Sequence, residues 1–226
     1  MKKVEEHKLV KAVIFDMDGV LIDSERISIR AWRRKAAELG LDRIDEVHRG
    51  CVGLNRNDGI ALLKSAYGND FDGEGFLSGA KEIMNEIIAE EGLPVKTGVQ
   101  EILTYLQEEK IPVALCSSTK MTGIQRNLEM TGLGGFFQKL ISGDMVEHSK
   151  PEPDIYLKAC DALGFAPHEC MAVEDSPNGI RSASRAGLIT ILVPDLVPPT
   201  EEMISLCFRK EETLLGLLTY LQNEQN

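Results

Sequence analysis

Apolar residues follow two different spacings along this chain, and these spacings divide it into three parts. Residues 12–15 form a continuous apolar run, which is typical of a strand buried on both faces of a parallel sheet. Between residues 23 and 92, apolar residues recur at helical spacing, and no segment predicts a strand. From residue 93 onward, strand-like and helix-like segments alternate. This alternation predicts an α/β fold with a doubly wound parallel sheet.

The part that follows the first strand predicts a small helical unit. Ser24 can cap a helix that stops at Gly40, and Asp58–Tyr67 predicts a second helix. A third helix is expected from about Phe76 to Glu91, because its apolar residues share one face. The expected domains are a helical unit at 23–92 and an α/β core made of 1–22 and 93–226.

The C-terminal part supplies the remaining elements of the expected core. Strands are predicted at 112–116, 139–141, 170–173 and 189–193, and helices at 99–106, 123–130, 153–163, 177–186 and 214–221. In doubly wound sheets, ligands bind beyond the carboxyl ends of the strands. Polar residues that directly follow a strand are therefore the first candidates for a functional site.

Two carboxylates end the first strand. Because side chains alternate along an extended chain, Asp16 and Asp18 are expected to share a side while Met17 points away. Gly19 then allows the backbone to turn sharply. Two neighbouring carboxylates are costly unless a cation lies between them, so the pair indicates a cation site. The structural alternative is a solvated acidic turn.

Three further polar clusters follow strands or begin helices, at Ser117–Lys120, Ser149–Asp154 and Glu174–Gly179. Each has an ordinary structural explanation: the first and third are typical of helix caps, and Lys150 alone is typical of a solvated lysine. Together the four clusters supply carboxylates, a hydroxyl, an ammonium group and helix N-termini. That set suits a phosphoryl group held by a divalent cation such as Mg²⁺.

Composition narrows the choice of partner. The chain has 226 residues and a net charge of -11, which disfavours nucleic acid or an anionic membrane as partner but not a small anionic substrate. The first eight residues are mostly charged and lack the apolar stretch of a signal peptide, and no apolar run reaches membrane-spanning length. The five cysteines show no CxxC spacing and are expected to be reduced thiols. We therefore expect a cytoplasmic protein, and the sequence leaves its oligomeric state open.

Four signatures in this chain resemble those of the haloacid dehalogenase superfamily. They are the Asp-x-Asp-Gly run at Asp16–Gly19, Ser117, Lys150 and the Glu174–Asp175 pair. The stretches 15–25, 149–156 and 173–180 are most similar to phosphatases and phosphosugar mutases akin to β-phosphoglucomutase. The resemblance covers nearly the whole chain, and the helical unit at 23–92 corresponds to the cap domain of that family.

The resemblance implies a role for each signature residue. Asp16 would be the nucleophile that forms an aspartyl-phosphate, and Asp18 would be the acid and then the base. Mg²⁺ would be held by the Asp16 carboxylate, the Asp18 backbone carbonyl and Asp175, with Glu174 orienting this set. The phosphoryl group would be bound by Ser117, Ser118 and Lys150. Dehalogenation is not implied, because the dehalogenases lack the second carboxylate.

The expected function is Mg²⁺-dependent hydrolysis of a small phosphate monoester, such as a sugar phosphate. Arg56 and Lys120 match positions where β-phosphoglucomutases contact substrate, which favours the alternative of a phosphosugar mutase, although Arg56 is equally typical of a solvated residue. Ser28 stands where those mutases carry a cap histidine that couples closure to catalysis. A mutase must keep water from its aspartyl-phosphate, so the loss of this histidine favours hydrolysis.

An alternative from another class is a receiver-like signalling module that is phosphorylated on aspartate. Receivers also gather acids, a hydroxyl and a lysine at the ends of a parallel sheet. They are, however, much shorter than this chain and lack a helical insertion behind the first acidic strand. A member that only binds its ligand is a further alternative, which is disfavoured because every signature position is filled.

Overall fold

The computed structural model describes residues 10–52, 54 and 56–224, and the described chain divides into two units. One unit comprises residues up to Ile22 and from Val95 onward, and the other comprises Asp23–Pro94. The second boundary was expected at 92/93 and lies at 94/95. The reason is that the two connecting segments pair: Ile22 forms an antiparallel bridge with Val95, and the Lys96 N–H donates to the Leu21 carbonyl at 2.9 Å.

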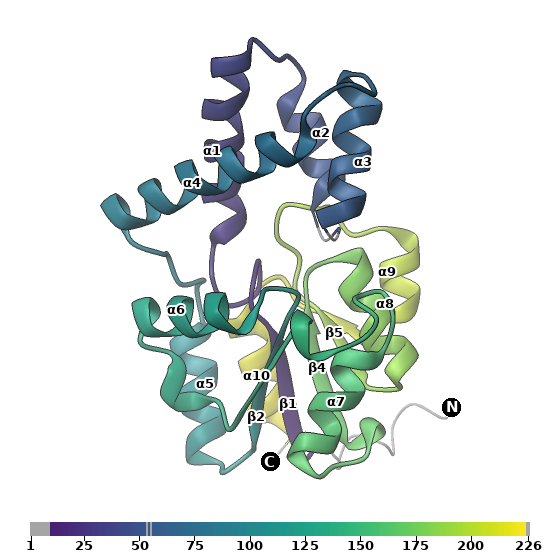
Figure 1. The fold of residues 1–226 in the computed structure, drawn as a ribbon. Coiled ribbons are helices and arrows are strands. Elements are labelled where there is room, and N and C mark those ends of the chain that lie inside the picture. The colour runs from purple at the N-terminus through teal and green to yellow at the C-terminus, as the bar shows by residue number, and fades with distance from the viewer. Residues whose placement is uncertain (1–9, 53, 55, 225–226) are drawn as a thin grey trace. The chain divides into compact units, whose positions relative to one another are not determined.

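A six-stranded parallel sheet forms the centre of the first unit (Figure 1). In spatial order its strands are β3 (Lys139–Ser142), β2 (Val113–Ser117), β1 (Ala12–Asp16), β4 (Cys170–Glu174), β5 (Ile189–Leu192) and β6 (Arg209–Lys210). Every residue of β1, β2 and β4 is buried, as expected for continuous apolar runs between two helical layers. The predicted fold class is confirmed, and β1 lies between β2 and β4 as the clusters at their ends require.

Helices cover both faces of this sheet (Figure 1). They are α5 (Val99–Glu108), α6 (Met121–Thr131), α7 (Asp154–Leu163), α8 (Pro177–Ala186), α9 (Glu201–Leu206) and α10 (Leu214–Glu224). On one face α5 packs against α10, and on the other α7 packs against α8, which packs against α9. The layer between strands and helices on this face is lined by small residues, namely Ala114, Ala159, Ala172 and Ala183. Because these side chains are small, the large side chain of Tyr156 fits among them.

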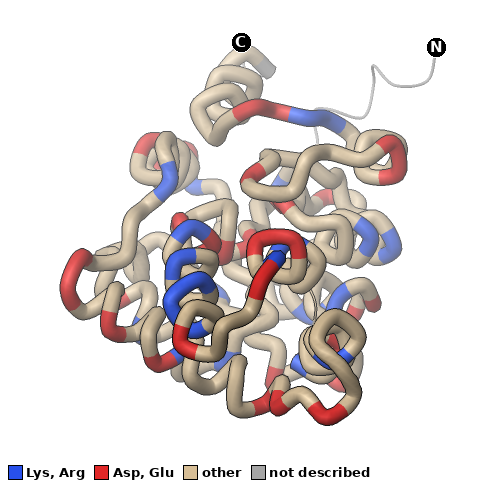
Figure 2. Tube along the Cα trace, turned by 90° about the horizontal axis from the view of Figure 1, so that it is seen from above, with Lys and Arg blue, Asp and Glu red and all other residues tan. Residues whose placement is uncertain are grey.

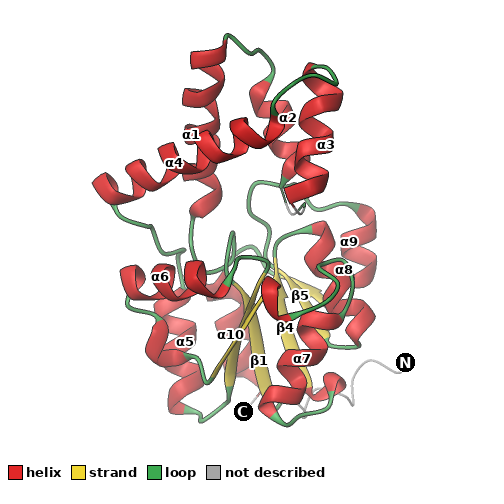
Figure 3. Cartoon of the chain, in the orientation of Figure 1, coloured by secondary structure: helices red, strands yellow, loops and turns green. Residues whose placement is uncertain are grey.

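The second unit consists of helices and loops in its described part (Figure 3). Its helices are α1 (Ser24–Leu39), α2 (Ile44–Cys51), α3 (Arg56–Tyr67) and α4 (Gly73–Glu91). The Trp32 ring forms edge-on contacts with Phe76 and His48, with centroid distances of 5.0 and 4.9 Å. These aromatic contacts tie α1, α2 and α4 together around one apolar core.

The structure differs from the predicted elements at helix ends and at short elements. Asp23, not Ser24, is the N-cap residue of α1, and α4 begins at Gly73 because Asp72 accepts a hydrogen bond from the Gly75 N–H at 2.8 Å. Helices α2 and α9 and strand β6 were not predicted. They are too short for apolar periodicity, and in α2 one of the three buried residues is His48.

Charged residues of both signs are spread along the described chain (Figure 2). On α1, Arg30 pairs with Glu91 and Arg33 pairs with Asp45, and all four side chains are exposed. Such exposed pairs contribute little to stability. Of the helices described, none combines the length and the apolar character that crossing a membrane requires.

His48 makes the helical unit sensitive to acid. Its side chain is buried, its Nε2 lies 2.9 Å from the Ser28 hydroxyl oxygen, and burial lowers its pKa from 6.5 to about 4. Between these values the unfolded chain binds a proton that folded His48 does not. The free energy of unfolding should therefore fall as the pH drops from 6.5 towards 4, by up to about 3 kcal/mol.

Urea unfolding followed by the fluorescence of Trp32, the single tryptophan, measures this loss. In His48→Gln the decline over this pH range should be much shallower, because the group that gains the proton is gone. His168→Gln, which alters an exposed histidine of the other unit, should keep the decline of the wild-type chain. Equal slopes for the wild-type and His48→Gln proteins would contradict the assignment.

Candidate active site

A buried ion-paired triad lies at the carboxyl ends of β1 and β4. Lys150, from the loop before α7, donates to Asp16 Oδ1 at 2.5 Å and to Glu174 Oε1 at 2.6 Å. The three residues are 8%, 7% and 0% exposed, respectively. Charged groups this deeply buried are stable only when paired, so both carboxylates depend on the ammonium group of Lys150.

Burial and neighbouring charges shift the protonation of this triad. Burial raises the pKa of Asp16 to about 8; Lys150 opposes the shift, while Glu174 and Asp18 add to it. Burial alone would lower the pKa of Lys150, but the attraction of Asp16 and Glu174 outweighs it and holds that pKa above its usual range. The ammonium group of Lys150 is therefore a permanent positive charge beside Asp16.

Asp18 is held by hydroxyl groups at the end of β2. Ser117 Oγ and Thr119 Oγ1 each donate to Asp18 Oδ2 at 3.3 Å, and Ser117 Oγ accepts from the Thr119 N–H at 3.0 Å. Within the cluster Ser117–Lys120, the N-cap residue of α6 is Lys120, whose side chain makes no capping hydrogen bond, whereas Ser117 bonds Asp18 instead. Thr119 was not predicted as a site residue, although it lies in the predicted cluster. The sequence feature that could have identified Thr119 is its position, two residues beyond the end of β2.

Glu174 has hydrogen-bond donors at both of its oxygens. Oε1 accepts from Lys150 and from the Tyr156 hydroxyl at 2.6 Å, while Oε2 accepts from the Asp175 N–H at 3.2 Å and from Ser176. Ser176 itself caps α8 through the Gly179 N–H at 3.1 Å. Within the cluster Glu174–Gly179, the residue that caps the helix is therefore Ser176, while Glu174 bonds Lys150 and Tyr156. Tyr156 is a second residue that the sequence analysis did not single out.

The carboxylates of this site fit a hard cation. Ligand oxygens of Asp16, Glu174 and Asp175 lie within 4.8 Å of one another, and all three residues are buried. Carboxylate oxygens are the ligands that Mg²⁺ prefers in proteins. Since donors already engage both oxygens of Glu174, Asp16 and Asp175 are the better ligands, and Glu174 is suited to orienting its neighbours.

Two glycines make room for the acidic residues. Gly19 has a φ of +82°, and a Cβ there would lie 2.1 Å from Asp175 Oδ2. At Gly179, in the first turn of α8, a Cβ would lie 2.0 Å from the Glu174 carboxylate. Any side chain at either position would displace the carboxylate that faces it.

Ser118 and Lys120 are exposed in the loop that joins β2 to α6, where Lys120 is the N-cap residue. The Ser118 backbone lies close to Gly143, where a Cβ would lie 2.4 Å from the Ser118 carbonyl oxygen. The two residues therefore lie on the loop that also carries Ser117 and Thr119. Among the described residues, neither side chain forms a hydrogen bond or an ion pair with Asp16, whose partner is Lys150.

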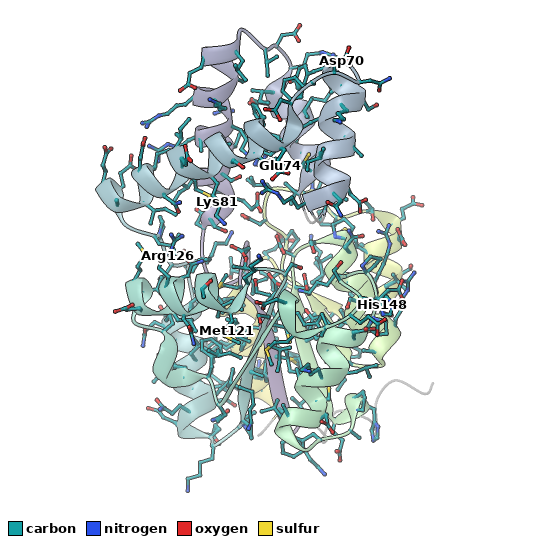
Figure 4. All side chains as sticks on the ribbon, in the orientation of Figure 1. Asp70, Glu74, Lys81, Met121, Arg126 and His148 are labelled. Carbon is teal, nitrogen blue, oxygen red and sulfur yellow. The ribbon has the colours of Figure 1, made fainter. Side chains whose placement is uncertain are left out.

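The predicted residues of the helical unit make contacts of their own. Arg56 donates to Glu74 Oε1 at 2.6 Å and to the Ser78 hydroxyl at 3.0 Å; Figure 4 labels Glu74 on α4. The Arg56 side chain is 48% exposed, so this pair is weak. Ser28 forms a hydrogen bond with His48 of α2. This partner was not predicted, because helix α2 itself was not predicted.

Residues 10–187 match the family model of haloacid dehalogenase-like hydrolases. The chain belongs to this family. The match includes every residue of the triad and all four predicted signatures, so the resemblance inferred from the sequence is confirmed.

Named relatives narrow the enzyme class. The chain is 32% identical over 179 residues to a phosphorylated carbohydrates phosphatase of Thermotoga maritima, covering 79% of this chain and 82% of the relative. It is 34% identical over 193 residues to hexitol phosphatase B of Escherichia coli, covering 82% and 84%. The expected class of phosphoric monoester hydrolase is confirmed, and the receiver-like alternative has no support in these relatives.

Solved structures agree on the fold. A β-phosphoglucomutase from Clostridium difficile superimposes with a TM-score of 0.77, covering 96% of this chain and 97% of that one. The two sequences are 20% identical, so this likeness concerns the fold alone.

Gly19→Ala tests the fit between the glycine turn and Asp175. The added Cβ would overlap the Asp175 carboxylate at a backbone conformation that alanine disfavours. We expect phosphatase activity to fall about 10²-fold, because displacements near 1 Å carry losses of that size. Gly135→Ala, where a Cβ meets nothing within 4 Å, should keep wild-type activity. Phosphate release at matched folded concentration measures both, and an active Gly19→Ala protein would contradict this close fit.

Proposed function

We propose that this chain is a Mg²⁺-dependent phosphatase that hydrolyses small phosphate monoesters of the sugar-phosphate class through an aspartyl-phosphate on Asp16. The observation that carries the proposal is the buried triad of Asp16, Lys150 and Glu174 beside Asp18 and Asp175. The substrate class is supported by the two relatives, whose names specify phosphorylated carbohydrates and hexitols.

In this proposal the substrate phosphate is bound between positive charge and hydroxyl groups. Asp16, the Asp18 backbone carbonyl and Asp175 hold Mg²⁺, which when bound supplies positive charge between the nucleophile and the anionic phosphate. Lys150 neutralises part of the charge on Asp16 and on the phosphoryl oxygens. Hydrogen bonds from Ser117 and Ser118 complete the binding of the phosphoryl group.

Two steps then transfer and release the phosphoryl group. A carboxylate oxygen of Asp16 attacks phosphorus, the bond to the leaving oxygen breaks, and Asp18 gives its proton to that oxygen. Asp18, now a carboxylate, takes a proton from a water molecule that attacks the aspartyl-phosphate. The phosphorus–oxygen bond to Asp16 breaks, inorganic phosphate leaves, and both aspartates return to their starting state. Both Ser117 and Thr119 donate to Asp18 in the structure; when substrate binds, the single Ser117 proton turns to the phosphoryl group and Thr119 keeps Asp18 oriented.

Contacts inside the helical unit favour hydrolysis over the mutase alternative. Ser28 is engaged with His48, so it offers no substitute for the mutases' cap histidine. Arg56 donates to Glu74 and Ser78, so a second phosphate at Arg56 would have to displace these partners. We assign Arg56 and Lys120 to selecting among substrates rather than to the chemical steps.

The roles of the two aspartates predict different defects. Asp16→Asn should abolish turnover, because an amide cannot form the aspartyl-phosphate. Asp18→Asn should lower kcat by about 10²–10⁴-fold, the usual contribution of general acid–base catalysis. With p-nitrophenyl phosphate, whose leaving group needs no acid, Asp18→Asn should accumulate phosphoenzyme that acid quenching and mass spectrometry detect on Asp16.

Asp161→Asn, an exposed change on α7, is the matched control and should behave as the wild-type chain does. Chelation with EDTA should stop phosphate release from the wild-type protein, and added Mg²⁺ should restore it. Near-normal turnover of Asp16→Asn, or full activity in EDTA, would refute the proposed mechanism.

The choice between phosphatase and mutase predicts a ratio of products. Several sugar phosphates should release inorganic phosphate without a bisphosphate activator. With β-glucose 1-phosphate as substrate, inorganic phosphate should form faster than the isomerisation product glucose 6-phosphate. This should hold with or without β-glucose 1,6-bisphosphate. Bisphosphate-dependent isomerisation that exceeds phosphate release would establish the mutase instead.

Arg56→Ala extends the same comparison to the helical unit. It should change the relative kcat/KM among sugar phosphates and leave p-nitrophenyl phosphate nearly unaffected, because the assigned role concerns the substrate's distal groups. Arg33→Ala breaks a similar exposed pair, with Asp45, and should change neither value. Loss of activity on every substrate in Arg56→Ala would contradict a role in selectivity.

A further inference from the structure

Tyr156 places one hydroxyl group inside the charged triad. It lies in the first turn of α7, is completely buried, and packs among the small side chains between α7, α8 and the sheet. Its hydroxyl donates to Glu174 Oε1 at 2.6 Å, and the Lys150 Nζ lies 5.1 Å from the centre of its ring. The residue therefore contacts two members of the triad without contacting Asp16.

The hydroxyl of Tyr156 and the ammonium group of Lys150 share one acceptor atom. Glu174 Oε1 receives both donors at 2.6 Å, whereas Lys150 divides its own donors between Glu174 and Asp16. Without the hydroxyl, a buried and charged oxygen would depend on Lys150 alone. The ammonium group would then be drawn towards Glu174 and away from Asp16.

We propose that Tyr156 is a positioning residue, whose hydrogen bond to Glu174 holds Lys150 in alignment with the nucleophile Asp16 and the phosphoryl group. This inference rests on the proposed function, since it assigns Lys150 to the transferring group. Its effect belongs to the transition state, where charge on the phosphoryl oxygens and Asp16 changes most. Binding of the substrate in its ground state should depend less on Tyr156, because groups other than Lys150 also bind the phosphate.

Tyr156→Phe isolates the hydroxyl, because phenylalanine keeps the ring and its packing. Using p-nitrophenyl phosphate as the probe, we expect kcat to fall about 10–100-fold, the usual range for groups that orient a site indirectly, with KM changed less than about three-fold. Tyr105→Phe is the matched control. The Tyr105 hydroxyl is also buried and has no hydrogen-bond partner among the described residues, so its removal should leave kcat unchanged.

A double-mutant cycle separates positioning from a general structural effect. In a Lys150→Arg background, which keeps a positive charge between the two carboxylates, Tyr156→Phe should alter kcat less than two-fold, because the ammonium group that it aligns is absent. Equal losses in both backgrounds would overturn the proposal, and so would a wild-type kcat in Tyr156→Phe. Failure of Tyr156→Phe to fold, as judged by circular dichroism, would also overturn it by assigning the hydroxyl to folding.

The same assay distinguishes this inference from the proposed function. If the wild-type chain releases no phosphate in the presence of Mg²⁺, both the proposed function and the role of Tyr156 are refuted. If the wild-type chain is active and Tyr156→Phe has the same kcat, only the role of Tyr156 is refuted.

Discussion

The structure of the site depends on one buried ammonium group shared by two buried carboxylates. Lys150 is 134 residues from Asp16 in the sequence and 24 from Glu174, yet it bonds both within 2.6 Å. Removing Lys150 would leave two carboxylates in the interior without their cation, which is far more costly than an exposed broken pair. The central place of β1 and the missing side chains at Gly19 and Gly179 are the geometric conditions for this arrangement.

Much of this arrangement could be predicted from the sequence because parallel sheets impose a simple rule. Continuous apolar runs identify the buried strands, and the carboxyl ends of neighbouring strands meet at one edge. Asp16 and Ser117 therefore had to come together once their strands were recognised. The same rule does not specify hydrogen bonds. Glu174 was expected to serve a metal site, and its bonds to Lys150 and Tyr156 depend on side-chain directions that spacing does not encode.

The residues that sequence analysis missed share a physical cause. Tyr156 and His48 each combine a polar group with a ring that packs in an apolar core. Each is buried through tertiary contacts, which the local spacing of apolar residues does not predict. His48 also lies on α2, which is only eight residues long and presents too few apolar positions to reveal its period. The boundary at 94/95 was missed for a related reason, because the segments that pair at Ile22 and Val95 are distant in sequence.

Charge balance links the fold to the proposed chemistry. Asp16, Asp18, Glu174 and Asp175 gather four carboxyl groups at the ends of β1 and β4, and Lys150 provides one permanent positive charge against them. Burial already raises the pKa of Asp16 to about 8, which shows how strongly the site resists further negative charge. A phosphate monoester would add more. In the proposed mechanism, a divalent cation held by Asp16 and Asp175 would supply the missing positive charge and allow an anionic nucleophile and an anionic substrate to approach each other.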